Sequence, residues 1–142
     1  MLYYLNIGTN LGKREQNLQR AIDAVQERFG KCLESDVVES EPWGFASDNA
    51  FLNVGVAVES DIEPLEMLQW IHRTERQLGS AAHRDAQGHY QDRLVDIDIM
   101  AIDDENGQPI TIDTEVLTVP HRHLTDRPFF MQPYLQLKSK TF

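Results

Sequence analysis

The chain has 142 residues, a formal net charge of −10 and a single cysteine, Cys32. This length fits one domain spanning 1–142, with a core large enough to fold without covalent cross-links. One cysteine excludes an intramolecular disulfide framework. The acidic balance argues against a nucleic-acid or anionic-membrane partner, because both need a basic surface.

The first ten residues, MLYYLNIGTN, contain no basic stretch and are interrupted by a glycine. They therefore predict neither a signal peptide nor a membrane span. Together with the lone cysteine, this indicates a cytoplasmic protein. We treat Cys32 as a small buried or edge residue.

The first half of the chain predicts a strand, a helix and two further strands. Residues 2–7 are typical of a strand, and in the GTNLG segment that follows, Thr9 or Asn10 is a candidate helix N-cap. Apolar residues then recur at helical spacing up to Gly30, which ends the helix. They are Leu18, Ala21, Ile22, Val25 and Phe29. Residues 32–39 predict a second strand, and ESEPWGFASDNA predicts a loop.

Residues 51–59 alternate between two faces, as a strand does. Leu52, Val54, Val56 and Val58 share one face, and Phe51, Asn53, Gly55 and Ala57 share the other. A second helix begins near Pro64, a residue suited to a first turn, and runs to Leu78. Its predicted inward residues are Leu65, Leu68, Ile71 and Leu78.

A long polar loop, GSAAHRDAQGHYQDR, leads to a predicted strand at 94–102. Asn-Gly within DENGQ indicates a hairpin turn. Short strands near 109–112 and 116–119 follow, with a short helix or turn near 123–137. The order β-α-β-β-α-β predicts a ferredoxin-like α+β sandwich, in which both helices pack on one face of an antiparallel sheet and a hairpin extends the C-terminal part.

Asp96 and Asp98 are the first candidate site. Residues i and i+2 of a strand share a face, with Cα atoms roughly 6–7 Å apart. Two carboxylates at this spacing can bind one hard cation or bridge two, and magnesium favours such a site when phosphates supply further oxygens. A solvated strand face is the alternative. Arg93 suits phosphate oxygens, or else an ion pair with a nearby aspartate.

Aromatic residues near the second and third strands are a second candidate. Trp43 lies in the SEPWGF loop, whose turn Pro42 and Gly44 fix. Phe51 and Asn53 share a strand face, so one can stack on a flat heterocycle while the other reads its edge. A tryptophan folded onto the core, and an edge aromatic beside a cross-strand amide, are the plainer alternatives.

The segment VPHRHLTDRPFF concentrates basic residues in an acidic chain. His121, Arg122, His123 and Arg127 fit phosphate and nucleotide contacts better than a zinc site, because no zinc signature is present. A solvated basic turn is the alternative. GTNLG lacks the Lys-Ser/Thr ending of a Walker A loop and is better explained as a tight turn.

These pieces together resemble the 6-hydroxymethyl-7,8-dihydropterin pyrophosphokinase family. The matching pieces cover nearly the whole chain and are, in order, GTNLG, SEPWG, FLN, TERQLG, RLVDIDIM and LTVPHRHLTDRPF. The resemblance implies the ferredoxin-like fold and transfer of pyrophosphate from ATP to the hydroxymethyl group of a reduced pterin, with release of AMP. It also implies two magnesium ions. Because members of the family are usually monomeric or weakly dimeric, we expect a monomer.

The resemblance also implies residue roles. Asp96 and Asp98 would hold both magnesium ions, and Arg93 would contact the transferring phosphates. The pterin would lie between Phe51 and Phe129, with its edge read by Asn53 and by the loop residues Ser40, Pro42, Trp43 and Gly44. The implied nucleotide contacts are Glu75, Ile99, Thr118, His121 and Arg127.

The chain departs from the family pattern in the nucleotide region. The family's arginines after the second helix and its R-W-G-P-R run are replaced within 80–92, where Arg84, with His83 or His89, is the candidate substitute. Val116 stands where a basic residue is usual, and Arg122 where an aromatic is usual. Slow catalysis or altered nucleotide handling is therefore expected. A degenerate paralogue that binds without turnover, and a regulatory domain without catalysis, are the alternatives.

Overall fold

The structure is a computed structural model, and it describes residues 1–41, 50–79 and 94–142. Some predicted site residues lie outside these ranges. They are Pro42, Trp43, Gly44, Arg84 and Arg93.

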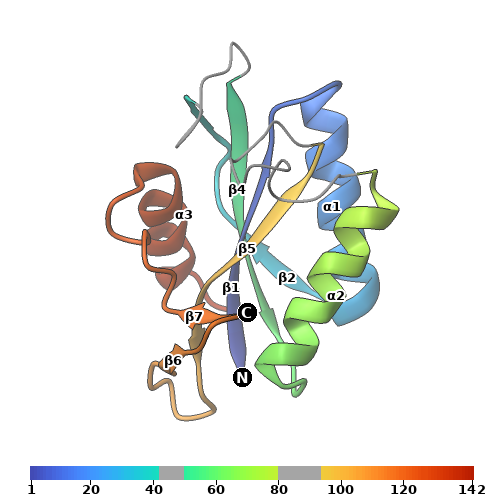
Figure 1. Cartoon of the computed structure of the whole chain (residues 1–142). Coiled ribbons are helices and arrows are strands. Elements are labelled where there is room, and N and C mark those ends of the chain that lie inside the picture. Colours follow the sequence, from blue (N-terminus) through green and yellow to red (C-terminus); the bar gives the residue numbers. More distant parts are fainter. Residues whose placement is uncertain (42–49, 80–93) are drawn as a thin grey trace.

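An antiparallel sheet forms the centre of the protein (Figure 1). Its middle strand, β1 (Leu2–Thr9), pairs with β4 (Phe51–Glu59) on one side and with β5 (Asp96–Asp103) on the other. Two short strands, β2 (Cys32–Glu34) and β3 (Val38–Ser40), both pair with β4. The antiparallel arrangement predicted from the sequence is confirmed.

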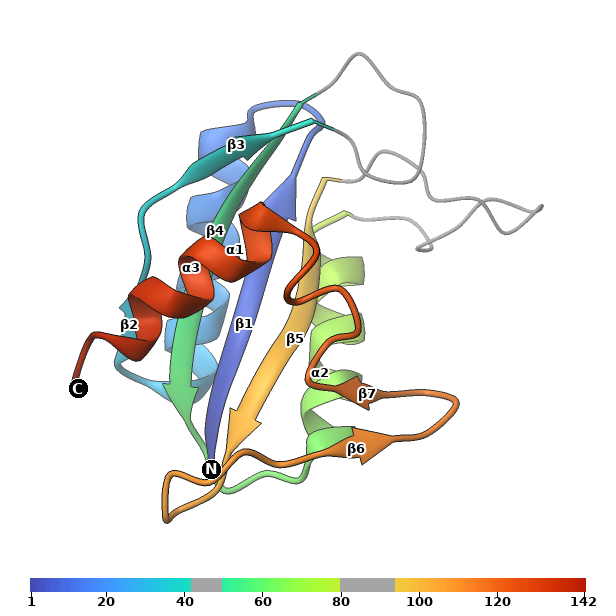
Figure 2. The same ribbon diagram turned by 90° about the vertical axis from the view of Figure 1, so that its left-hand side faces the viewer.

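Helices lie on both faces of this sheet (Figures 1 and 2). The helices α1 (Arg14–Phe29) and α2 (Pro64–Gln77) cover one face, so the ferredoxin-like prediction for these two helices is confirmed. The C-terminal helix, α3 (Pro128–Lys138), crosses the other face, which the sequence left without a predicted occupant. A small hairpin of β6 (Ile112–Asp113) and β7 (Thr118–Val119) lies beside β5, near its predicted position.

Two apolar layers hold these elements together. The larger lies between the sheet and α1 with α2, and includes Leu5, Ile7, Val56 and Ile71. The smaller lies under α3 and includes Tyr4, Ala57, Met100 and Leu137. The alternation predicted for β4 is confirmed, because its valines enter the larger layer while Ala57 enters the smaller.

The helix ends differ in detail from the predictions. Helix α1 begins at Arg14 with Lys13 at its N-cap, so neither Thr9 nor Asn10 caps it. Thr9 instead belongs to β1, which runs farther than predicted. In α2, Leu65 is 54% exposed, whereas Met67 and Trp70 are buried. The proline-initiated first turn of α2 leaves Leu65 on its outer side.

The predicted second strand is interrupted at Ser35. The Gly55 N–H donates to Ser35 Oγ at 2.7 Å, and the Ser35 N–H donates to the Gly55 carbonyl at 2.9 Å. A side-chain hydroxyl thus takes the place of a backbone carbonyl. The strand divides there into β2 and β3, which pair with opposite halves of β4.

β5 contains one extra residue relative to β1. Leu5 pairs with Ile99, but Tyr4 pairs with Ala101, so Met100 is the additional residue of a β-bulge. Met100 and Ala101 consequently both enter the layer under α3. The alternation predicted for this strand holds up to Ile99, and Ile102 returns to the larger layer.

The C-terminal end of α3 is tied to the sheet by a polar cluster. Asp103 is 5% exposed and accepts hydrogen bonds from Tyr4 Oη at 3.1 Å and from Lys138 Nζ at 3.2 Å. The ammonium of Lys138 also lies 5.5 Å from the centre of the Tyr4 ring. A buried carboxylate needs such partners to offset its lost hydration.

Replacing Tyr4 by Phe removes one of these donors and leaves the buried Asp103 carboxylate under-satisfied. We expect the free energy of unfolding to fall by about 1–2 kcal/mol in urea denaturation. The surface variant Gln19→Ala, which loses only an exposed hydrogen bond to Asp23, should change it by less than about 0.5 kcal/mol. Equal stability of Tyr4→Phe and the parent chain would contradict this role for Asp103.

Candidate active site

The carboxylates of Asp96 and Asp98 lie on the face of the sheet that α3 crosses. Asp96 pairs across the sheet with Gly8 and Asp98 with Asn6, and both aspartates are partly exposed. Directly opposed residues of antiparallel strands point to the same side. The strand register therefore places the two carboxylates side by side, next to β1.

An amide and an aromatic ring occupy the same face on β4. Asn53 is 2% exposed, and its Nδ2 donates to Ser40 Oγ at 2.8 Å. Phe51 pairs with Ser40, and Asn53 pairs with Gly8 on its other side. The structure thus brings together Ser40, Phe51 and Asn53, three of the residues assigned to the pterin.

Gly8 makes room for this group, a role that sequence reasoning missed. A Cβ added at Gly8 would lie 3.0 Å from Asn53 Oδ1 and 3.4 Å from Phe51 Cδ1. Any side chain there would press on both, so the glycine keeps the face open between Asn53 and Asp96. A glycine inside a strand often marks such a close approach, which is the signal the sequence offered.

Phe129 reaches this face from the first turn of α3. The Nδ2 of Asn6 donates to the Phe129 carbonyl at 2.9 Å. The guanidinium of Arg127 lies 5.7 Å from the centre of the Phe129 ring and 5.0 Å from that of Phe130. Phe129 is half-buried, whereas Phe130 is fully buried beneath it.

A hollow of about 340 Å³ lies along the outer edge of β5. It is bordered by α2, β5 and the β6–β7 hairpin, and four of the predicted site residues line it: Asp98, Ile99, Thr118 and His121. Val116 and Arg122 also line it, as does His72 of α2, which sequence reasoning did not single out. Because Asp98 borders both this hollow and the α3 face, it connects the two halves of the candidate site.

Glu75 belongs to α2 and contacts β5, the strand that contains Asp96 and Asp98. It is 4% exposed, and its Oε2 accepts a hydrogen bond from the Ile97 N–H at 2.8 Å. This bond joins α2 to β5 at the residue between the two aspartates. The role of Glu75 as a nucleotide contact stays a prediction, and its contact with Ile97 gives it a structural role as well.

His121 is oriented by its own turn. Its backbone N–H donates to the Met100 carbonyl at 2.9 Å, and its Nδ1 accepts from the His123 N–H at 3.1 Å. Burial, together with the nearby Arg127 charge, lowers the pKa of His121 to about 4, while Asp96 acts in the opposite direction. A neutral ring with Nδ1 occupied carries its proton on Nε2, which can donate to a ligand.

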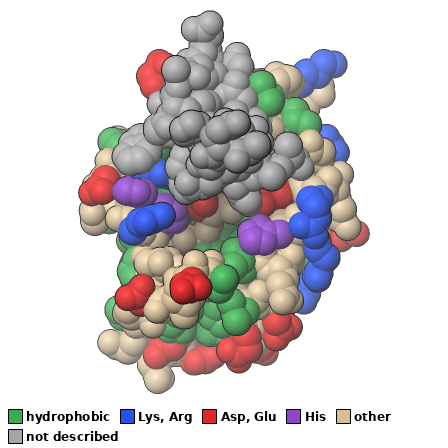
Figure 3. Space-filling view, in the orientation of Figure 1, with side chains coloured by type: hydrophobic (Ala, Val, Ile, Leu, Met, Phe, Trp, Pro, Cys, Tyr) green, Lys and Arg blue, Asp and Glu red, His purple; other side chains and the backbone are tan. Residues whose placement is uncertain are grey.

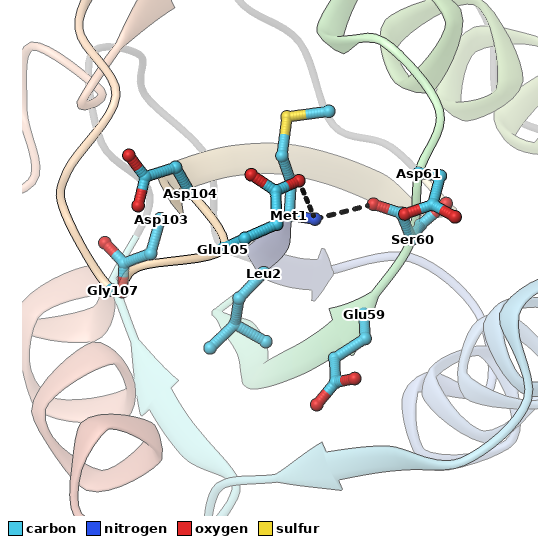
Figure 4. Close-up of a pocket in the computed structure, with 9 residues that line it drawn as sticks. All are labelled: Met1, Leu2, Glu59, Ser60, Asp61, Asp103, Asp104, Glu105 and Gly107. Atoms are coloured by element: carbon cyan, nitrogen blue, oxygen red, sulfur yellow. Dashed lines mark hydrogen bonds and ion pairs between the residues drawn. The ribbon is translucent and has the colours of Figure 1, made fainter.

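A second hollow, of about 630 Å³, lies at the other end of the sheet (Figure 4). Acidic side chains surround it, and the amino group of Met1 donates to the Ser60 carbonyl at 3.0 Å there. In the space-filling view acidic side chains gather along this lower edge, whereas histidines and basic side chains lie higher (Figure 3). An anionic ligand is therefore repelled from this end of the sheet.

Magnesium fits the aspartate pair by its donor chemistry. Within the described ranges no three His, Cys, Asp or Glu side chains converge as a metal-binding group. Magnesium does not need such a group, because it commonly binds one or two carboxylates and takes its other oxygens from water and substrate phosphates. Asp96 and Asp98 supply that minimal set.

The fold and site together define a small α+β enzyme with an aromatic and amide face beside a carboxylate pair. Residues 4–139 match the model of the family described as 7,8-dihydro-6-hydroxymethylpterin-pyrophosphokinase (HPPK). The chain belongs to this family.

Individual relatives agree with this assignment. The 2-amino-4-hydroxy-6-hydroxymethyldihydropteridine pyrophosphokinase of Porphyromonas gingivalis is 36% identical over 93% of this chain and 87% of its own length. That of Aquifex aeolicus is 33% identical over 95% of this chain and 79% of its own. A solved HPPK-DHPS structure in complex with substrates shares the fold, with a TM-score of 0.66 at 14% identity over 96% of this chain and 40% of that chain.

The lowered pKa of His121 predicts a measurable pH dependence. In long-range ¹H–¹⁵N spectra of the ligand-free protein, His121 should titrate near pH 4, with Nε2 protonated above that pH. Because the unfolded ring binds its proton near pH 6.5, stability should decrease as pH falls from about 6.5 to 4. A titration midpoint at or above 6.5 would show that the ring is not buried in this way.

Proposed function

We propose that the α3 face and the β5 hollow form one active site, which transfers pyrophosphate from ATP to 6-hydroxymethyl-7,8-dihydropterin and releases AMP. As a member of the HPPK family, the chain is a pyrophosphokinase of folate biosynthesis. What we propose beyond membership is the assignment of its residues. This assignment rests on the strand register. Gly8 pairs with Asn53 on one side and with Asp96 on the other, and Asp98 lies two residues farther along the strand of Asp96.

The pterin is assigned to the α3 face. Phe51 and Phe129 would stack on its two sides, while Asn53 and Ser40 read its edge by hydrogen bonds. The Ser40–Asn53 bond orients the amide in advance, which lowers the entropy lost on binding. Pro42, Trp43 and Gly44, outside the described residues, remain predicted partners in the same loop.

The nucleotide is assigned to the hollow at the β5 edge. Ile99 and Thr118 would contact it there, and His121 would donate from Nε2 to a phosphate oxygen. Arg127, Arg93, Arg84 and Glu75 remain predicted contacts. Asp98, which borders the hollow, then faces the triphosphate on one side and the pterin on the other.

The reaction needs alignment and charge stabilisation more than covalent participation by the protein. The pterin hydroxyl oxygen would bond to the β-phosphorus of ATP while the bond between the α–β bridging oxygen and the β-phosphorus breaks, so AMP is the leaving group. Asp96 and Asp98 would hold the magnesium, which when bound offsets phosphate charge and acidifies the attacking hydroxyl. Asp98 is also the candidate acceptor of the hydroxyl proton.

No helix in the described part of the chain has the length and apolarity needed to cross a membrane.

The expectations from the sequence about oligomeric state, cellular location and turnover are also proposals. A monomeric, cytoplasmic enzyme is proposed, as is slow turnover or altered nucleotide handling, because 80–92, Val116 and Arg122 depart from the family pattern. The family match favours catalysis over the paralogue or regulatory-domain alternatives.

Magnesium-dependent AMP release separates these alternatives directly. With both ATP and 6-hydroxymethyl-7,8-dihydropterin present, we expect stoichiometric AMP and pterin diphosphate, and with either ligand omitted we expect neither product. Chromatographic quantification of AMP provides the measurement. Pterin binding without AMP would support the degenerate paralogue, and absence of both would support the regulatory domain.

Asp98→Asn keeps the shape of the side chain but removes its charge and its basicity. We expect kcat to fall at least about 100-fold, together with weaker magnesium activation, because charge stabilisation at phosphates is the largest catalytic contribution. Asp23→Asn, an exposed substitution on α1, is the matched control and should leave turnover unchanged. Normal turnover with normal magnesium dependence in Asp98→Asn would overturn the assignment.

A further inference from the structure

Phe129 is held at the sheet by a hydrogen bond that comes from outside its own helix. In an α-helix the Phe129 carbonyl would accept from the N–H of residue 133. Residue 133 is proline, which lies inside α3 and carries no N–H. The ring of a helical proline also pushes the carbonyl four residues earlier away from its regular direction.

Asn6 supplies the missing donor. Its Nδ2 lies 2.9 Å from the Phe129 carbonyl oxygen, and Asn6 itself is 2% exposed. It occupies the centre of the sheet face, opposite Gly55 on β4 and Asp98 on β5. This partly buried hydrogen bond joins the first turn of α3 to β1, and losing the donor leaves the carbonyl without the partner that its own helix cannot supply.

A close contact under Pro133 sets the distance of the same helix from the sheet. A Cβ added at Gly55 would lie 2.8 Å from Pro133 Cβ and 2.9 Å from Leu137 Cδ1. The helix therefore rests directly on the glycine backbone. Gly55 therefore limits the distance between α3 and the sheet. Asn6 fixes the position of the first turn of α3.

We propose that Asn6 is a positioning residue, which fixes Phe129, through its carbonyl, relative to the strand face that carries Phe51 and Asn53. This inference rests on the proposed pterin site. A stacked ligand needs its two rings at a defined separation, and a shift of the first turn of α3 changes that separation directly. Asn6 itself does not line the nucleotide hollow, although its cross-strand neighbour Asp98 does.

Pro133 provides a rescue experiment. Asn6→Leu removes the donor at similar volume, and Pro133→Ala restores a helical N–H to the Phe129 carbonyl while keeping the Cβ over Gly55. We expect Asn6→Leu to raise the dissociation constant of 6-hydroxymethyl-7,8-dihydropterin about 3- to 10-fold, measured by calorimetry with magnesium and a non-hydrolysable ATP analogue present. In the Asn6→Leu/Pro133→Ala protein the constant should return to within about twofold of Pro133→Ala alone.

Kinetics and a matched control complete the test. Asn6→Leu should raise KM for the pterin with KM for ATP nearly unchanged. Tyr4→Phe, which weakens only the far end of α3, should lower stability without changing pterin affinity. Asn6→Ala is the second variant if Asn6→Leu does not fold, with the same expected direction and the same rescue by Pro133→Ala.

Each outcome of the rescue experiment has a distinct meaning. If Asn6→Leu lowers pterin affinity by the same factor with and without the Pro133→Ala substitution, Asn6 acts directly on the ligand or on Asp98, and the inference is overturned. Unchanged affinity in Asn6→Leu would overturn it as well. If the parent chain itself fails to bind the pterin, the proposed function fails first.

Discussion

The antiparallel pairing of β1 with both β4 and β5 is the constraint on which the site depends. Because β1 lies between them, a single register aligns Asn53, Gly8 and Asp96 across three strands, and Asn6 with Asp98 in the next row. A shift of one residue would send these side chains into the apolar layer under α1 and α2. The larger core therefore stabilises the fold and also fixes the order of the polar row on the opposite face.

Charged side chains are unevenly distributed along this sheet, and the basic ones near the candidate site suit an anionic substrate. Asp96 and Asp98 lie near His121, Arg122 and Arg127, whereas the other end of the sheet is surrounded by acidic side chains. The net charge of −10 thus describes the surface as a whole and does not reveal that Arg122 and Arg127 lie at the end near the candidate site. Under the proposed function, cations held by the aspartates would add positive charge at this end.

Local patterns predicted the strands, the helices and the shared face of the two aspartates, because side-chain periodicity is decided within a few residues. The family resemblance gave the chemistry. Details that depend on distant contacts were not predictable in this way: the interruption at Ser35 needs Gly55, and the exposure of Leu65 depends on how α2 packs. The roles of Gly8 and Asn6 emerge only when β4 and α3 are placed against β1.

The bulge at Met100 has a consequence for the whole site. The extra residue lies where β5 passes Tyr4 and Leu5 of β1, and it reverses the alternation of every side chain of β5 that follows it. The same insertion turns Asp103 toward Lys138 and Ile102 toward the larger core. One irregular residue therefore lets Asp96 and Asp98 at one end of β5 and Asp103 at the other end share the face that α3 crosses.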